Sequence, residues 1–111
     1  RLVCFLARLK QVSSNEPLKA IGVDERTAVV IDKNGFAHIL GQSYAYFLED
    51  NRPDEQPEKL QSLFPLNWNL DQRALKYLST NQPEALILDL STWDWEWDGF
   101  WFVEDGILKV N

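Results

Sequence analysis

The dipeptide Asn34-Gly35 constrains this chain more than any other feature, because it stands between two runs of strand-forming residues. Residues 27–32 are rich in β-branched side chains, and residues 36–40 form a second apolar run. An Asn-Gly pair between two such runs is the strongest short-range signal for a β-hairpin. The sequence therefore predicts an antiparallel hairpin centred on this turn.

Further elements are expected on both sides of the hairpin. Apolar residues recur at helical spacing over Leu2–Val12, which predicts a helix that is apolar nearly all round and ends at the polar stretch 13–17. Residues 20–24 and 44–48 have strand composition. Later in the chain we expect a polar loop at 49–58, a short helix or a strand at 71–78, a strand at 85–90 and a terminal hairpin within 92–110, while residues 60–66 fit no single element.

The apolar character of the helix and of residues 20–23 is typical of elements that are covered on more than one side. We expect residues outside this chain to cover an apolar patch made of Leu2, Phe5, Leu6, Ile21 and Val23. The chain contains no methionine and opens into apolar residues without a capping residue, so we expect it to begin inside a longer protein. Cys4, the single cysteine, forms no internal disulfide and is expected to be a small core side chain.

The overall charge argues against two classes of partner. The formal net charge is -6, whereas nucleic acids and anionic membranes bind basic surfaces, so neither is expected as a partner. No apolar run approaches the length of a membrane span, and the compartment stays open because a signal peptide would lie upstream. With 45% hydrophobic and 25% charged residues, the composition is that of a globular protein, and residues 1–111 are expected to form a single unit.

The stretch Gly41-Gln42-Ser43-Tyr44-Ala45 approximates the nucleophile elbow of serine hydrolases. An elbow needs a strand before its serine and a helix after it, but the residues after Ser43 have strand character. We therefore expect a glycine bulge between two strands rather than a nucleophile. Ser43 is therefore not expected to be catalytic.

The other polar candidates favour structural roles. His38, the only histidine, is expected on a strand face as a hydrogen-bonded structural residue. The chain has no cluster of His and Cys, so neither a metal nor another cofactor is expected. The pair Asp24-Glu25 can perform acid–base chemistry or can accept backbone hydrogen bonds in a turn, and the second interpretation is favoured.

Three tryptophans, Trp93, Trp95 and Trp97, alternate with acidic residues near the end of the chain. A period of two places them on one face of a strand. Such a face can stack against sugars or peptide aromatic groups, or it can pack in a core or a subunit interface. The sequence leaves these alternatives open.

A family resemblance centres on the acidic pair. The segment Ala20-Ile21-Gly22-Val23-Asp24-Glu25-Arg26-Thr27-Ala28-Val29-Val30 resembles the pattern Gly-Ile-Gly-Ile-Asp-Glu-x-Thr-Ala of cyanophycinases and their relatives, which include the dipeptidase peptidase E. The likeness continues through Ala37-His38-Ile39-Leu40-Gly41 and residues 44–48, and Arg1-Leu2-Val3 with Leu6-Ala7 is similar to the end of a family segment. Residues 1–48 are thus a family-like core, and residues 49–111 look like a variant loop and an aromatic tail.

The resemblance implies an α/β fold. The chain would be the C-terminal part of a class I glutamine amidotransferase-like (flavodoxin-like) three-layer sandwich, contributing one helix and mainly antiparallel strands. It also implies a serine-type peptidase, an exopeptidase-like hydrolase that cleaves aspartyl peptide or isopeptide bonds in a peptide or cyanophycin-like substrate. The family's catalytic serine and histidine lie upstream of the position matched by Arg1, so the resemblance implies no catalytic residue within this chain. The upstream part of the same protein would be a partner. A homodimer is expected by analogy.

Arg1 is the only substrate-binding residue that the resemblance carries over. It matches the last arginine of a cluster that lines the family's substrate pocket, where a guanidinium can hold a carboxylate through two hydrogen bonds. It can equally be a chain-end residue without a function. Two other interpretations of the whole chain also stay open: a non-catalytic carbohydrate- or protein-binding module that uses the Trp-rich tail, and a catalytically inactive family member.

Overall fold

The hairpin at Asn34-Gly35 is present in the computed structural model, which describes residues 2–12, 17–60, 65–81 and 88–111. The Asp32 carboxylate accepts hydrogen bonds from the backbone N–H groups of Asn34 and Phe36, at 2.8 and 3.1 Å. Gly35 has a φ of 85°, a conformation that glycine adopts without steric cost. The turn is therefore closed by the residues from which it was predicted.

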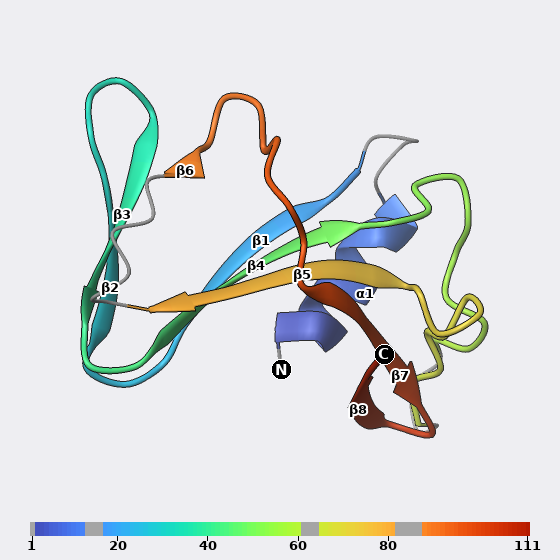
Figure 1. The fold of residues 1–111 in the computed structure, drawn as a ribbon. Coiled ribbons are helices and arrows are strands. Elements are labelled where there is room, and N and C mark those ends of the chain that lie inside the picture. Colours follow the sequence, from blue (N-terminus) through green and yellow to red (C-terminus); the bar gives the residue numbers. More distant parts are fainter. Residues whose placement is uncertain (1, 13–16, 61–64, 82–87) are drawn as a thin grey trace.

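Within these residues the chain forms one α-helix and eight β-strands, and all strand pairs are antiparallel (Figure 1). Five strands form one sheet in the order β1-β4-β5-β7-β8, and three form a second sheet in the order β2-β3-β6. In chain order the elements are α1 (Leu2–Val12), β1 (Lys19–Val23), β2 (Thr27–Ile31), β3 (Phe36–Gly41), β4 (Tyr44–Asp50), β5 (Leu75–Asn81), β6 (Leu88–Asp89), β7 (Gly99–Glu104) and β8 (Ile107–Val110).

The β1–β4 and β2–β3 pairs are two halves of one long bent ribbon. Val23 faces Ala45 in the first half, and Thr27 faces Gly41 in the second. Three residues on each strand lie between these pairs, so the ribbon bends without an inserted residue. Figure 1 shows the β2–β3 hairpin rising steeply from the end of the β1–β4 pair.

The fold class that the resemblance implied is wrong for this chain. A flavodoxin-like sandwich has a parallel sheet with helices on both faces, whereas the described residues form two antiparallel sheets and one short helix. The physical reason lies in the connections. Tight turns such as Asn34-Gly35 and Asp105-Gly106 join antiparallel neighbours, while parallel strands need a crossover of a dozen or more residues. The described residues nevertheless contain one helix and antiparallel strands.

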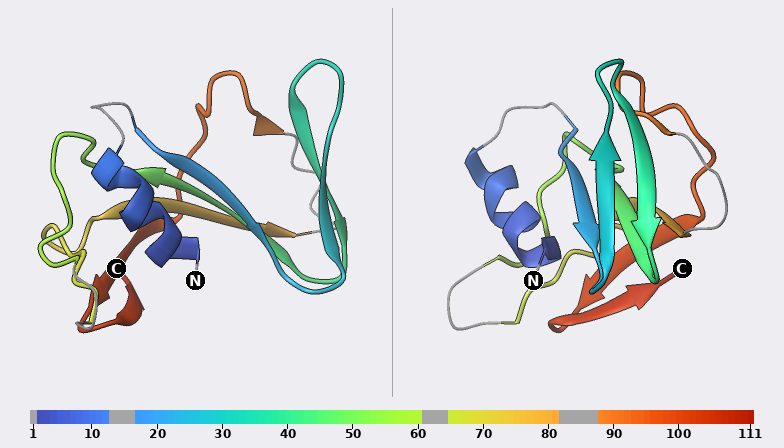
Figure 2. Two further views of the ribbon diagram at one scale, coloured as in Figure 1. Left: turned by 180° about the vertical axis from the view of Figure 1, so that it is seen from behind. Right: turned by 90° about the vertical axis from the view of Figure 1, so that its left-hand side faces the viewer.

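Helix α1 covers one face of the five-stranded sheet (Figure 2). Val3, Leu6 and Ala7 point inward and are almost completely buried. They join a core that includes Leu48 of β4 and the fully buried Trp68. In the part of the chain that the structure describes, no helix has the length and apolar character needed to cross a membrane.

The opposite face of the sheet is covered by the three-stranded sheet and by the segment that leads into β7, which crosses it in orange in Figure 1. Phe47 of β4 is fully buried here and packs in a second core with Ile39 of β3. The three tryptophans of residues 91–98 pack against this core. The five-stranded sheet therefore lies between two apolar cores.

Lys10 is the polar exception on the inward face of α1, with only 3% of its surface exposed. Its ammonium pairs with the carboxylate of Asp50, which is itself 2% exposed, at the end of β4. It also donates a hydrogen bond of 2.9 Å to the backbone carbonyl of Arg52 and lies 6.0 Å from the centre of the Trp68 ring. These contacts fix the last turn of α1 to the sheet.

The outward face of α1 corrects the interpretation of Cys4, which is exposed rather than in the core. A helix turns by about 100° per residue, so Cys4 and Phe5 leave the inward face that Val3 and Leu6 occupy. Apolar neighbours in the sequence did not reveal on which side of the helix Cys4 lies.

The expected apolar patch is present only in part. Phe5 is 61% exposed and Val23 is 52% exposed, as an uncovered patch requires. Leu6, in contrast, is buried by other residues of this chain, and Leu2 and Ile21 pack against the two cores. The chain therefore covers one side of its helix by itself.

The second half departs from the sequence predictions in several places. The polar loop begins one residue after Asp50, because β4 extends to that residue, and the segment 71–78 is strand only from Leu75 onward. Residues 91–98 form no strand, although their tryptophans do point to one side. The terminal hairpin is confirmed as β7 and β8. Residues 85–87 of the expected strand at 85–90, and residues 61–64, lie outside the described residues.

Replacing Lys10 with Met should destabilise the protein by about 3–5 kcal/mol, because it leaves the Asp50 carboxylate buried without its cation. The matched control is Lys19→Met, which removes a lysine that is 41% exposed and 3.9 Å from Glu49, and should cost less than about 1 kcal/mol. Urea unfolding followed by tryptophan fluorescence measures both. Equal free energies of unfolding for the two variants would contradict a stabilising buried pair.

Candidate functional site at the ribbon bend

The bend depends on a close contact between the two strands of the ribbon. Gly41 has a φ of 121°, and a side chain on it would place its Cβ 2.0 Å from the carbonyl oxygen of Arg26. That carbonyl accepts the backbone N–H of Gln42 at 3.0 Å. Arg26 itself has a φ of 57°, in the left-handed region. Glycine is therefore required at position 41, but for a bend and not for the expected bulge.

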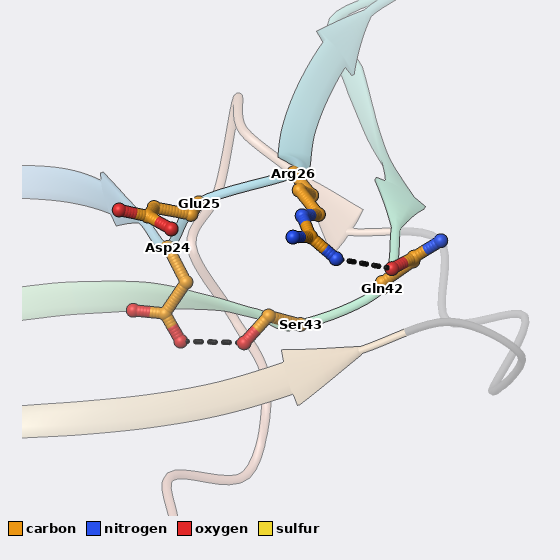
Figure 3. A pocket seen from close by; sticks show the side chains of 5 residues that line it. All are labelled: Asp24, Glu25, Arg26, Gln42 and Ser43. Atoms are coloured by element: carbon orange, nitrogen blue, oxygen red, sulfur yellow. Dashed lines mark hydrogen bonds between the residues drawn. The ribbon is translucent and has the colours of Figure 1, made fainter.

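Side-chain hydrogen bonds hold the two strands together across the bend (Figure 3). One carboxylate oxygen of Asp24 accepts the Ser43 hydroxyl at 2.8 Å and the Tyr46 hydroxyl at 3.1 Å. The Thr27 hydroxyl accepts the Ser43 backbone N–H at 3.0 Å and donates to the Glu25 carbonyl at 3.2 Å. Asp24 is thus a structural acceptor, although its strongest partners are hydroxyl groups and not the expected backbone donors.

The proton affinities of this cluster follow from its hydrogen bonds. The Ser43 hydroxyl has the largest effect and lowers the pKa of Asp24. Desolvation has the next largest effect and opposes it, while the Tyr46 hydroxyl and a Tyr44 backbone bond lower the pKa further. Burial raises the pKa of the Tyr46 hydroxyl, and the neighbouring Asp24 carboxylate raises it further. At neutral pH the carboxylate is therefore an ionised acceptor and the tyrosine a protonated donor.

An open pocket of about 420 Å³ lies at the bend and is lined by Asp24, Glu25, Arg26, Gln42 and Ser43. Figure 3 shows two sides of it: Arg26 lies beside Gln42, with a long contact of 3.5 Å between their side chains, while Asp24 lies beside Ser43. The pocket combines a guanidinium, an amide and carboxylates. Such a set can bind a small polar group that carries both charges, but its lining includes no histidine that could serve Ser43 as a base.

Neither the serine nor the histidine of the sequence analysis is arranged for catalysis. Ser43 donates its hydroxyl proton to Asp24, and β4 follows it directly, so the helix of a nucleophile elbow is absent at this point. His38 lies on β3 with its Nε2 3.1 Å from a carboxylate oxygen of Asp32. The single histidine is therefore engaged at the hairpin turn and holds a structural position.

The tryptophans of the aromatic tail pack against one another and against the sheet. The ring centres of Trp93 and Trp95 are 5.0 Å apart, and that of Trp95 is 5.5 Å from that of Phe47. The Lys19 and Lys76 ammonium groups lie 5.5 and 5.2 Å from the rings of Trp93 and Trp97, respectively. This arrangement favours core packing over an open stacking surface for sugars.

A second aromatic row was missed in the sequence. Tyr44, Tyr46, Trp101 and Tyr77 follow one another on the helix-side face of the sheet, with neighbouring ring centres 6.4, 5.7 and 5.2 Å apart. The spacing of two between Tyr44 and Tyr46 was the available signal. The other two rings come from β7 and β5, and their positions become visible only with the strand order.

The remaining candidates give no site. Arg1, the expected substrate-binding residue, lies outside the described residues. Within the described part of the chain, no three His, Cys, Asp or Glu side chains converge as metal ligands.

Comparisons with known proteins give no relative. No protein-family model matches the chain, and neither a curated protein nor a solved structure shows significant similarity to it.

Replacing Asp24 with Asn should reduce the stability of the chain and its dependence on pH. Because folding lowers the pKa of Asp24, its stabilising contribution is present above the pKa of the unfolded state and is lost as the pH falls through the pKa of the folded state. Melting temperatures from pH 7 to about pH 2 should therefore fall less steeply in the variant than in the wild type. Asp94→Asn, at an exposed position of the tail, is the control and should leave the profile unchanged.

Replacing Gly41 with Ala should cost about 3 kcal/mol or more, because the new methyl group overlaps the Arg26 carbonyl in an unfavourable backbone conformation. Gly35→Ala is the matched control, since Gly35 also has a positive φ but no atom within 4 Å of the added Cβ. It should cost only the conformational penalty, about 1–2 kcal/mol. Chemical unfolding compares the two, and a smaller loss for Gly41→Ala would show that the bend is not tightly constrained.

Proposed function

We propose that this chain is part of a cyanophycinase-like serine-type peptidase, which hydrolyses aspartyl peptide or isopeptide bonds. The observation that carries the proposal is the segment Ala20–Val30, because its polar residues are those that build the bend. Asp24 and Thr27 form the hydrogen bonds across the ribbon, and Glu25 and Arg26 line the pocket. These residues thus share a structural role at the bend, and this shared role supports the proposal.

In this proposal the chain has a supporting role, and the serine nucleophile and histidine base come from residues that precede Arg1. The engagement of Ser43 by Asp24 and of His38 by Asp32 supports such a division, because both candidate groups already have structural partners. A substrate carboxylate would then meet Arg1, if the match to the family's arginine cluster holds. The flavodoxin-like fold is no part of the proposal, which rests on the motif residues alone.

The alternative of a binding module on the Trp-rich tail has less support. Its three tryptophans lie against Phe47 and one another, so most of their ring surface is occupied. An inactive family member would keep the bend and lack the upstream nucleophile, and only the upstream residues distinguish it from the active enzyme.

The test compares the 111-residue chain with the longer natural protein that the proposal requires. The pure chain should not hydrolyse β-aspartyl-arginine or aspartyl dipeptides, because its single histidine, His38, pairs with Asp32 and not with Ser43. The longer protein should hydrolyse at least one of them, and a fluorophosphonate probe should label a serine outside residues 1–111. Amine release and mass spectrometry of the labelled peptides are the measurements.

Ser43→Ala is the matched variant for the same assay. It should leave the activity of the longer protein within a few-fold of the wild type once melting has shown that both are folded. Turnover by the isolated chain that disappears in Ser43→Ala would refute the proposal and establish Ser43 as a nucleophile. A longer protein without turnover and without a labelled serine would support the inactive member instead.

A further inference from the structure

Strand β8 is the last strand of the five-stranded sheet and is exposed on both faces. Figure 1 shows it at the outer margin of the sheet, next to β7. Ile107 is 61% exposed, Leu108 46% and Val110 62%, so the apolar residues of both faces meet water. Folded proteins normally protect such an edge with charges, prolines or a covering segment, because it can pair with another strand. Only Lys109 supplies a charge here.

The backbone pattern shows which groups of β8 are available. Phe100 and Asn111 exchange both of their N–H to carbonyl hydrogen bonds, at 3.3 and 2.8 Å. Hydrogen-bonded pairs alternate along an antiparallel ladder, so Lys109 and Ile107 also direct their N–H and carbonyl groups toward β7. The N–H and carbonyl groups of Leu108 and Val110 therefore point away from the sheet.

We propose that β8 pairs with β8 of a second copy of this chain, antiparallel and about a two-fold axis at Leu108. In this register the two Leu108 residues exchange both of their backbone hydrogen bonds. The Leu108 side chains lie directly opposite each other on one face. The two five-stranded sheets thereby become one continuous sheet.

Charge complementarity selects this register over its neighbour. A pairing centred on Lys109 would use the same backbone groups but would place two ammonium groups directly opposite, which is destabilising. The register centred on Leu108 places each Lys109 opposite Ile107 of the other copy. Ile107 faces Glu104 on the neighbouring strand β7. The Lys109 ammonium of one copy therefore approaches the Glu104 carboxylate of the other copy. It also keeps the contact of 3.2 Å to Glu104 of its own copy.

The sheets also end in β1, β2 and β6. Strand β6 has only two residues, and in β1 the three residues between Lys19 and Val23 are partly buried. Strand β2 is the stronger competitor, because it exposes both Val30 and Ile31. Its Thr27 and Val29, however, are only partly exposed, and Val29 packs against the second core. Strand β8 has no such buried side, so it offers a partner strand both of its faces. Because the pairing uses only the β7–β8 hairpin, it is independent of the proposed peptidase function.

Sedimentation velocity of the full 111-residue chain, from about 10 µM to about 1 mM, tests the pairing, because a short edge contact gives weak association. The wild type should move from monomer toward dimer over this range. Leu108→Lys places like charges on the axis, and Leu108→Pro removes an outward N–H without removing a bond to β7, so both should stay monomeric. Ile31→Lys, the same kind of change on β2, should associate like the wild type.

A disulfide experiment tests the register itself. Facing residues of a hydrogen-bonded antiparallel pair have their Cα atoms about 5.5 Å apart, which a disulfide can span. The double variant Cys4→Ser, Leu108→Cys should oxidise to a covalent dimer, whereas Cys4→Ser, Ile31→Cys should not. Circular dichroism and melting confirm that each variant is folded.

Each remaining outcome overturns the pairing. A wild-type chain that stays monomeric at the highest concentration directly contradicts the pairing. A folded Leu108→Lys variant that still associates shows that β8 is not the interface. If association is lost in Ile31→Lys, or if a disulfide forms at position 31 and not at position 108, the interface lies at β2 and not at β8.

Discussion

The unbroken register of the ribbon determines where almost every other element can lie. Side chains alternate along a strand, so a slip of one residue would exchange Phe47, which faces the tryptophans, with Leu48, which faces α1. Both are completely buried, and either exchange would disrupt a packed core. Strand β5 pairs with β4 over its whole length, so it inherits the same register, and the end of β4 places Asp50 under Lys10.

Polar side chains are concentrated where the ribbon bends. Some of them hold the two strands together, and their neighbours line the pocket. Asp24 and Ser43 form hydrogen bonds that hold the strands together. Glu25 and Arg26, one and two positions later, are not needed for those side-chain bonds and line the pocket. A change of pocket chemistry at these two positions therefore leaves the hydrogen bond between Asp24 and Ser43 in place, which is how a rigid scaffold can carry a variable site.

What could be predicted from the sequence depended on the range of the deciding contacts. Helix Leu2–Val12 and the Asn34-Gly35 hairpin are determined by near neighbours, and both were predicted. The hydrogen-bond partners of Asp24, Ser43 and Tyr46, lie 19 and 22 residues away in the sequence. They can be identified only if the register of the hairpin is continued through the bend. The fold class failed because it was carried over from a resemblance centred on one segment, while the sheet order depends on contacts such as Leu75 with Asp50 that the segment does not contain.

The same continuous register has a kinetic consequence. Pairing can start at the tight turn between Asp32 and Phe36 and proceed outward through the bend, and each new pair closes almost no additional loop. We therefore expect the ribbon to form on the timescale of a hairpin, about 1–10 µs. Joining β5 to β4 instead requires closure of the long segment between Asp50 and Leu75. The conformational entropy of this segment is lost before the contacts between the two strands form and compensate for the loss. The ribbon should therefore be the template on which the slower half of the chain folds.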